Sequence, residues 1–233
     1  MIIKWIFDRV VALLGLLVLW PVLLVIAILV KMKMPGGTVF FVQKRIGKSG
    51  KLFNCHKFRS MTIKHNGSSV SVAGDSRITP FGASLRHYKL DELPGLWDVL
   101  VGNMSFVGPR PDVPGYADKL AGDDRDVLKL RPGITGPATL KYRLEDEMLR
   151  QFCEQASKGF ISSEVSEGFK GQLPDFLKMS TQELAVWYND NIIYPDKVRL
   201  NCYYYRHYSF LKDIEMIIAT VLRRKIKFAG EEF

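Results

Sequence analysis

The sequence predicts an α+β protein that is mostly helical and whose first helix is associated with a membrane. Three observations indicate this fold class. Residues 10–30 form a run of 21 residues without a charge. Residues 38–61 are rich in β-branched and aromatic residues on both sides of a turn, which is typical of a small β-hairpin. Residues 90–101 and 210–222 repeat apolar residues at helical spacing.

Composition and charge narrow the class of protein. The 233 residues are 47% hydrophobic and 24% charged, which excludes a disordered or collagen-like chain. The three cysteines form no CxxC pair and the four histidines no HExxH motif, so neither a disulfide scaffold nor a zinc site is indicated. The net charge of +9 is uneven: residues 1–62 hold ten basic side chains and one acid, whereas residues 144–196 are acidic.

The uncharged run at residues 10–30 has the length of a membrane helix. As a straight helix it spans about 30 Å, the thickness of a bilayer core. A cleaved signal peptide fits poorly, because lysines follow the run where small residues are expected. Basic residues flank both ends, so the positive-inside rule keeps both ends cytoplasmic. Two geometries stay open from the residues: a straight crossing, and a re-entrant helix that breaks at Trp20-Pro21 and returns to the same face.

A β-hairpin is expected directly after the membrane helix. Pro35-Gly36-Gly37 ends that helix, and a Lys48-Ser49-Gly50 turn separates two strand-like segments. Residues 35–62 contain six basic residues and no acid. They are either a patch for anionic lipid headgroups, worth about 1 kcal/mol per basic residue, or a set of phosphate ligands. Residues 63–76 are small and polar and predict a surface loop. No Walker A or GxGxxG pattern occurs, which argues against P-loop and Rossmann folds.

The candidate chemistry lies in residues 90–111. Residues 90–101 predict one helix with an apolar face, and Asp91 and Glu92 fall in its first turn. Capping of free N–H groups is the ordinary explanation for such acids. Adjacent helical residues point about 100° apart, so a functional pair is expected to have two distinct roles. Arg110 lies between two prolines that restrict its backbone, which favours a positioned phosphate clamp.

Six motifs that follow one another along the chain resemble those of a known family. They are QKRIG (43–47), KFRSM (57–61), RITPFG (77–82), LDELP (90–94), MSFVGPRP (104–111) and RPGITG (131–136). Together they are similar to the bacterial sugar transferases, the monotopic phosphoglycosyl transferases that begin surface-glycan assembly. The resemblance runs to about residue 143 and resumes at residues 188–222.

The resemblance implies a reaction. Family members transfer a sugar phosphate from a UDP-sugar to undecaprenyl phosphate and release UMP. They act at the cytoplasmic face of the bacterial inner (plasma) membrane, in exopolysaccharide, capsule or O-antigen synthesis. By this similarity Asp91 is the nucleophile that forms an acyl-phosphate intermediate. Glu92 either holds Mg²⁺ together with Asp91 or handles the proton of the lipid phosphate. Mg²⁺ is the implied cofactor.

The resemblance also implies binding residues and a domain plan. Lys57, Arg59, Arg86 and Arg110 match basic motif positions and are expected to bind the phosphoryl group. Pro21 is expected to break the membrane helix, which favours the re-entrant geometry. The expected regions are a re-entrant helix (1–34), a catalytic core (35–143), an acidic variable insertion (144–187) and a C-terminal helical region packed on the core (188–233).

Two residues depart from the family pattern, and one segment matches none. Gly95 stands where the family usually has Gln, and Asp98 stands where it usually has Asn. A missing amide is expected to alter contacts around the acidic pair. Residues 150–185 are acidic and partly helical; a lid, a partner surface and a solvated insertion all stay open, with solvation as the default.

The end of the chain predicts an amphipathic helix. Apolar residues at 210–222 precede a basic cluster at 223–227. The helix either packs in the core with cationic caps or lies in the membrane interface. The rival function is a non-catalytic membrane-anchored protein that binds anionic lipids. Nucleic acid is not an expected partner, because no recognised motif with base-stacking aromatics occurs. The sequence is compatible with a homodimer without deciding the oligomeric state.

Overall fold

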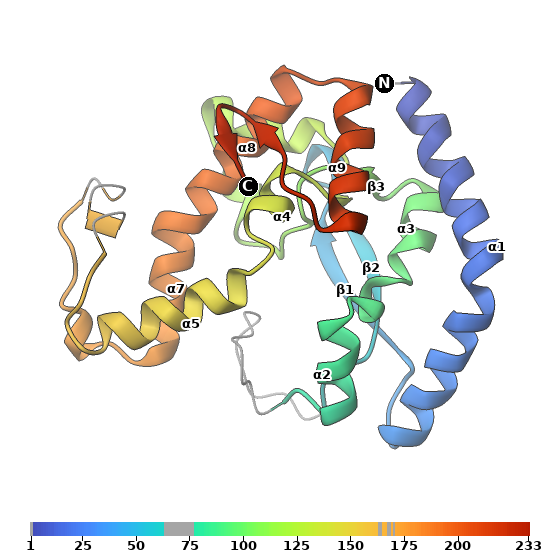
Figure 1. Ribbon diagram of the computed structural model, residues 1–233, viewed down its shortest axis with the longest axis horizontal. Coiled ribbons are helices and arrows are strands. Elements are labelled where there is room, and N and C mark those ends of the chain that lie inside the picture. Colours follow the sequence, from blue (N-terminus) through green and yellow to red (C-terminus); the bar gives the residue numbers. More distant parts are fainter. Residues whose placement is uncertain (1, 63–76, 163–164, 167–168, 170) are drawn as a thin grey trace.

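The computed structural model describes residues 2–62, 77–162, 165–166, 169 and 171–233. The described chain is mostly helical and contains three two-stranded sheets, so the predicted α+β, helix-rich class is confirmed (Figure 1). The surface loop predicted at 63–76 lies outside the described residues.

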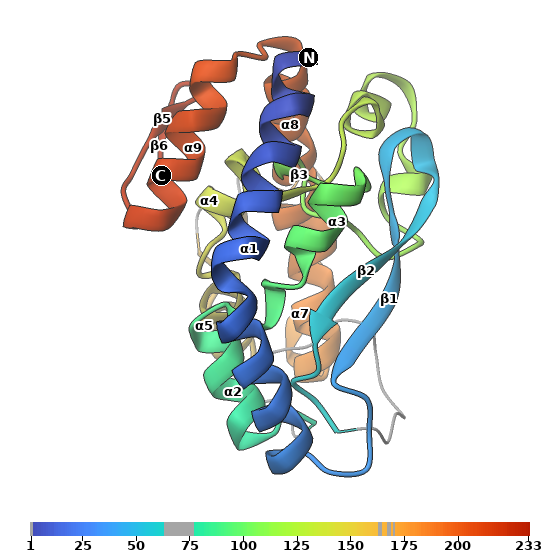
Figure 2. The same cartoon turned by 90° about the vertical axis from the view of Figure 1, so that its right-hand side faces the viewer.

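The first helix, α1, covers Ile2–Lys33 and runs along one whole side of the molecule (Figure 2). At 32 residues it is about 48 Å long, and it is apolar enough to cross a membrane. Pro21 lies inside this continuous helix. The break expected at Trp20-Pro21 is therefore not an interruption of helical structure, because a proline removes only one helical hydrogen bond and the flanking turns continue.

Both ends of α1 are attached to the rest of the protein. Near its start, the Lys4 Nζ atom donates to the Asp213 carboxylate at 2.8 Å, and both side chains are buried. The carboxylate of Asp8, also buried, accepts from the Ser105 hydroxyl at 2.7 Å. At the other end, Ile26, Val30 and Met34 pack with Phe58 and Leu85. Lys4 and Asp8, which the sequence places next to the membrane segment, are therefore buried within the protein and paired there.

The buried Lys4–Asp213 pair gives a stability prediction. Replacing Asp213 by Ala leaves the Lys4 ammonium buried without a counter-charge, so we expect the free energy of unfolding to fall by about 3–5 kcal/mol. Urea unfolding of the detergent-purified protein measures this. Glu215→Ala is the control, because Glu215 on the same helix forms an exposed pair with Lys212 and such pairs contribute about 1 kcal/mol or less. Equal losses in the two variants would contradict the prediction.

The predicted β-hairpin is present. Strands β1 (Phe40–Ile46) and β2 (Leu52–Phe58) pair antiparallel, with Phe40 opposite Phe58 and Ile46 opposite Leu52. The connecting turn η1 (Lys48–Gly50) places Ser49 and Gly50 at positive φ, a conformation that glycine adopts without strain.

The helix expected over residues 90–101 is two separate pieces. Leu90–Glu92 form a short 3-10 turn, η2, and helix α3 covers only Gly95–Val101. Pro94 lies between them and cannot continue the first piece with a backbone hydrogen bond. Asp91 and Glu92 therefore do not lie in the first turn of a regular helix. The turn follows helix α2 (Pro80–His87) and starts after Lys89, whose φ is 57°.

Two of the sequence motifs pair with each other. Strand β3 (Ser105–Val107) and strand β4 (Gly133–Thr135) run parallel, with Ser105 opposite Gly133. Just past β3, a Cβ atom on Gly108 would lie 2.2 Å from the Arg131 carbonyl oxygen. Only glycine permits this close approach, which explains why both motifs contain glycine and fixes the start of the loop that holds Arg110.

The remaining elements complete the described fold. They are η3 (Ala117–Lys119), η4 (Gly122–Lys129), α4 (Pro137–Lys141), α5 (Glu145–Ala156), η5 (Phe176–Lys178), α7 (Thr181–Tyr188), the π-helical turn η6 (Asn189–Ile193), α8 (Tyr194–Arg206), α9 (Phe210–Leu222), β5 (Lys227–Phe228) and β6 (Glu231–Glu232).

The acidic segment between α4 and α8 packs a core of its own. Helices α5 and α7 extend away from α1 (Figure 1), and Phe152 stacks on Tyr188 with ring centroids 4.3 Å apart. Phe176 and Trp187 add edge contacts. The described part of this segment is therefore a folded aromatic cluster with acidic side chains outside it.

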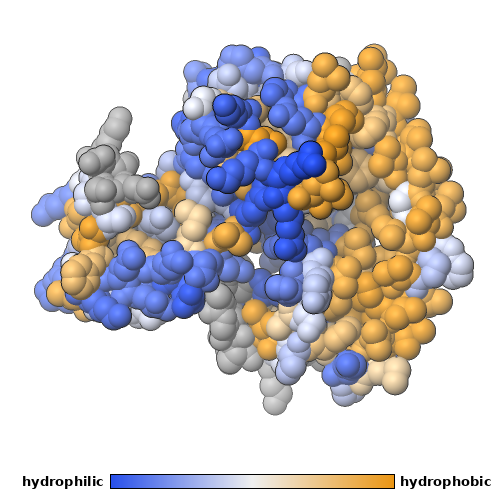
Figure 3. Space-filling view, viewed as in Figure 1, coloured by the Kyte–Doolittle hydropathy of each residue, from blue (hydrophilic) through white to orange (hydrophobic). Residues whose placement is uncertain are grey.

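Helix α9 has one buried face and one exposed apolar face. Met216 and Ala219 are buried, which fits the packed-helix alternative. Leu211 is 79% exposed and Val221 75% exposed, which fits the interfacial alternative. A broad apolar surface covers the α1 side of the molecule (Figure 3), and the exposed side chains of α1 supply much of it.

Candidate active site

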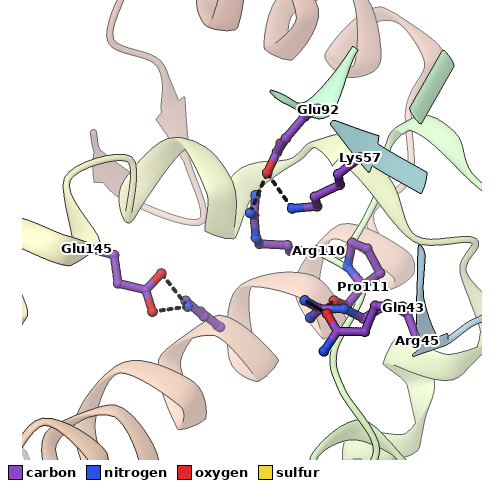
Figure 4. Close-up of polar contacts among 8 residues, drawn as sticks. Gln43, Arg45, Lys57, Glu92, Arg110, Pro111 and Glu145 are labelled. Carbon is purple, nitrogen blue, oxygen red and sulfur yellow. Dashed lines mark hydrogen bonds and ion pairs between the residues drawn. The ribbon is translucent and has the colours of Figure 1, made fainter. Parts of the chain in front are cut away.

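Glu92 lies at the centre of a charged cluster. Its Oε1 atom accepts from the Lys57 Nζ atom at 2.8 Å and from an Arg110 Nη atom at 2.6 Å (Figure 4). Lys57 comes from β2, Glu92 from the η2 turn and Arg110 from the loop after β3. The structure thus brings together three predicted site residues that are up to 53 positions apart in the sequence.

This cluster keeps Glu92 ionised. Burial alone would raise the pKa of Glu92, but the charges and hydrogen bonds of Arg110 and Lys57 outweigh it and hold the pKa well below its usual value of 4.5. In turn, the Glu92 charge raises the pKa of Arg110. At neutral pH Glu92 is therefore a fixed negative charge that orients two cations, and it is poorly suited to carry a proton.

Asp91 has a different environment from its neighbour. Its side chain is only 8% exposed, and Oδ1 is buried without a hydrogen-bond partner among the described residues. Burial, followed by the Glu92 charge, raises the pKa of Asp91, whereas Lys57, Arg86 and Lys89 oppose that shift. A buried carboxylate oxygen without a partner is costly unless something binds it. The two acids therefore lie in two different environments.

An open cleft lies beside this cluster. Its charged lining includes Glu92, Lys57, Arg110 and Arg45. Sequence reasoning missed Arg45 as a site residue, although it lies within the QKRIG motif. Arg45 donates to the Pro111 carbonyl at 3.0 Å and to Gln43 at 2.6 Å (Figure 4). With three cations and one carboxylate, the cleft suits an anionic ligand such as a diphosphate.

The loop that carries Arg110 is held from two sides. The hairpin binds it through Arg45 and through the Ile46 N–H, which donates to the Asp112 carbonyl at 2.9 Å. From α8, the Tyr194 hydroxyl donates to the Asp112 carboxylate at 3.1 Å, and burial raises the pKa of Asp112 to about 6. The two prolines restrict Arg110 locally, but these tertiary contacts determine where it points.

The other two predicted basic residues lie outside the Glu92 contacts. Arg86, on α2, is close enough to Asp91 for its charge to lower the pKa of that carboxyl. Arg59 instead donates to the Met34 carbonyl, and its side chain is buried. The hydrogen bond of the Arg59 guanidinium therefore goes to Met34, the residue that follows α1.

A second acid–base pair, absent from the predicted site, borders the cleft. The ring of His56, on β2, lies against the carboxylate of Asp98, on α3. The one feature of the sequence that pointed to this pair was Asp98, an acid at a position where the resemblance led us to expect Asn.

The residues present also fit a magnesium ion. The described residues contain no group of three or more His, Cys, Asp or Glu side chains placed to hold a metal. Mg²⁺ is commonly bound by one or two carboxylates, with substrate phosphates and water as the other ligands. The partnerless Asp91 oxygen and the carboxylate of Glu92 suit that arrangement.

Fold and site together define a class of protein. Such a protein has a membrane-type helix along its side and a cationic cleft lined by Glu92. The neighbouring acid, Asp91, has a buried carboxylate oxygen without a partner among the described residues. The chain belongs to the bacterial sugar transferase family, whose sequence model matches residues 1–157. The family resemblance predicted from the six motifs is thereby confirmed.

Several relatives share the greater part of this chain. A UDP-glucose:undecaprenyl-phosphate glucose-1-phosphate transferase of Xanthomonas campestris is 33% identical over 93% of this chain and 37% of its own length. An Escherichia coli protein of the same name is 41% identical over 62% of this chain and 32% of its own. A putative undecaprenyl-phosphate N-acetylgalactosaminyl 1-phosphate transferase of Bacillus subtilis is 38% identical over 61% of this chain and 79% of its own. The chain thus spans about a third of the length of the first two.

Proposed function

We propose that this chain transfers a sugar 1-phosphate from a UDP-sugar to undecaprenyl phosphate, releases UMP and so starts the synthesis of a surface polysaccharide. Membership of the bacterial sugar transferase family supports the reaction class, and the names of the relatives support both substrates. The observation that carries the proposal is the buried Oδ1 of Asp91, which has no hydrogen-bond partner among the described residues. Asp91 directly precedes Glu92, which lines the cationic cleft.

In this proposal Asp91 is the nucleophile. Its carboxylate attacks the sugar-bearing phosphorus, UMP leaves, and a phosphosugar remains bound to Asp91 until the lipid phosphate takes it. Lys57 and Arg110, oriented by Glu92, stabilise the negative charge of the phosphoryl oxygens. Asp91 and Glu92 would hold Mg²⁺, and the bound ion would neutralise the charge of the diphosphate.

The attachment of α1 supports a monotopic arrangement on the membrane. Contacts at Lys4 and at Val30 tie both ends of the helix to the same globular body. A helix attached along its length cannot cross a bilayer while that body stays on one side. We infer that both ends stay at the cytoplasmic face of the inner (plasma) membrane, with the apolar surface of Figure 3 in the lipid. A bend at Pro21 within the helix would deepen this insertion.

The test is UMP release by the detergent-purified protein from a panel of UDP-sugars. We expect release to require Mg²⁺ and to turn over only with undecaprenyl phosphate. Without the lipid we expect a burst of about one UMP per protein, because the covalent intermediate cannot be discharged. EDTA is expected to abolish both phases. Absence of release with every donor, alongside normal vesicle binding, would favour the non-catalytic lipid-binding alternative.

A further inference from the structure

A buried aspartate fixes the orientation of a histidine at the edge of the cleft. Asp98 is fully buried, and both of its carboxylate oxygens bind His56. Oδ2 accepts from the His56 backbone N–H at 2.9 Å, and Oδ1 lies 2.8 Å from the ring Nδ1 atom. Burial raises the pKa of Asp98, and the hydrogen bonds from His56 oppose that rise.

This geometry assigns the two ring nitrogens different tasks. An ionised carboxylate only accepts hydrogen bonds, so Nδ1 carries a proton and donates it to Asp98. The other nitrogen, Nε2, has no hydrogen-bond partner within the described part of the chain. The His56 side chain is 32% exposed and lines the same cleft as Lys57, Glu92 and Arg110. Nε2 is therefore the nitrogen available to a substrate.

Position 98 requires an acid if it is to hold this histidine by both contacts. A single amide oxygen of Asn does not reproduce a two-oxygen acceptor for both the backbone N–H and the ring of His56, nor does it supply a negative charge. Asp98 does both. Asp98 and His56 therefore form one hydrogen-bonded unit, in which the carboxylate fixes the orientation of the ring.

The other titratable residues in the cleft, and Asp91 next to Glu92, are poorly suited to carry a proton. The two cations that bind Glu92 keep it ionised, and Asp91 is the proposed nucleophile. Lys57 and Arg110 are held in ion pairs. Burial raises the pKa of the Cys55 thiol and disfavours its ionised form. Among the described titratable side chains that line the cleft, His56 alone offers a ring nitrogen without a partner, on the side-chain type that most often transfers protons in enzymes.

We propose that His56, positioned by Asp98, is the proton carrier of both half-reactions; this inference rests on the proposed function. At the start both ring nitrogens are protonated. A carboxylate oxygen of Asp91 bonds to the β-phosphorus of the UDP-sugar, and the bond to the bridging oxygen of UMP breaks. That oxygen keeps the electron pair and takes the proton from Nε2, so UMP leaves singly protonated.

The second half-reaction returns the proton. Undecaprenyl phosphate arrives as its monoanion and gives its proton to Nε2 of His56. Its freed oxygen bonds to the sugar-bearing phosphorus, the bond to Asp91 breaks, and the electron pair returns to the Asp91 carboxylate. Both residues end as they began. The charged groups around His56 are Asp98 from α3, Arg45 from β1, Lys57 from β2, Glu92 from η2 and Arg110 from the loop after β3.

The experiment compares His56→Asn with the wild type in the UMP-release assay across about pH 5–9. The Asn side-chain amide can still donate to Asp98, so the buried carboxylate keeps a partner, but Nε2 is gone. We expect kcat at neutral pH to fall about 100-fold, with KM for the UDP-sugar little changed and the limb of the pH profile that belongs to His56 lost. We expect a smaller fall for Asp98→Asn, and partial recovery of His56→Ala by free imidazole. His207→Asn, at the residue that follows α8, is the control.

The outcomes separate the two proposals. Wild-type kcat and pH profile in His56→Asn would overturn the proton-carrier role and leave the proposed function standing. Loss of activity in His56→Asn with a lowered unfolding temperature, and no imidazole recovery in His56→Ala, would indicate a structural histidine and also overturn it. A wild-type protein that is inactive with every donor would overturn the proposed function, and this inference with it.

Discussion

Asp91→Asn is expected to lower UMP release by about 10⁴-fold or more and to abolish the burst seen without lipid acceptor. The reason is that the amide has no charged oxygen to attack phosphorus, and loss of a covalent nucleophile removes the whole two-step route. Because Oδ1 of Asp91 has no protein partner in the described chain, the substitution breaks no hydrogen bond of that atom. We therefore expect the free energy of unfolding to be unchanged or slightly increased.

Two readouts make this prediction specific. Asp146→Asn, the same acid-to-amide change on the exposed face of α5, should keep wild-type activity. Flotation with anionic lipid vesicles should be unaffected by Asp91→Asn, because the apolar surface of α1 is untouched. Near-normal UMP release by Asp91→Asn would show that Asp91 is not the nucleophile.

Glu92→Gln is expected to lower kcat/KM for the UDP-sugar by about 10³-fold. Glu92 holds Lys57 and Arg110 through one oxygen atom, and a neutral amide removes the charge that keeps two cations together. The change also removes one of the two carboxylates proposed to hold Mg²⁺. Loss of a single preorganised electrostatic group costs about 10²–10³-fold in rate. We expect the upper end of this range because one carboxylate serves both purposes.

A matched control for this variant is Glu231→Gln. Glu231 also binds two cations, Lys141 and Arg199, but it lies on β6 and does not line the cleft. Its loss should change kcat/KM by no more than about twofold. Equal losses of activity in the two variants would indicate that Glu92 matters only for folding.

The contribution of Glu92 to the free energy of unfolding is expected to depend on pH. Its pKa in the folded protein is held below the usual 4.5, with Arg110 and Lys57 outweighing the effect of burial. Its contribution to folding is therefore fully present above about pH 4.5, decreases below that pH and is lost as pH falls through the folded-state pKa. The difference in unfolding free energy between the wild type and Glu92→Gln should accordingly be smaller at pH 3 than at pH 7.

Local signals in the sequence determined much of this protein. The uncharged run predicted α1, the β-branched segments around Lys48-Ser49-Gly50 predicted the hairpin, and the ordered motifs predicted the family. These features depend on neighbouring residues: hydrophobic length, β-branched and aromatic composition, and turn chemistry act within a few positions. The same local rules failed at residues 90–101, where Pro94 separates the acidic turn from α3.

Only the tertiary structure decided which side chains meet. The Glu92 cluster joins residues from β2, η2 and the loop after β3, and Arg59 turns toward Met34 although it lies two positions after Lys57. Lys4 and Asp8 look like charges flanking a membrane helix, yet they are buried in the protein. His56 shows no motif, and it becomes a candidate only because Asp98 is packed against it. Charge pairing and burial depend on distance in space, which one sequence does not reveal.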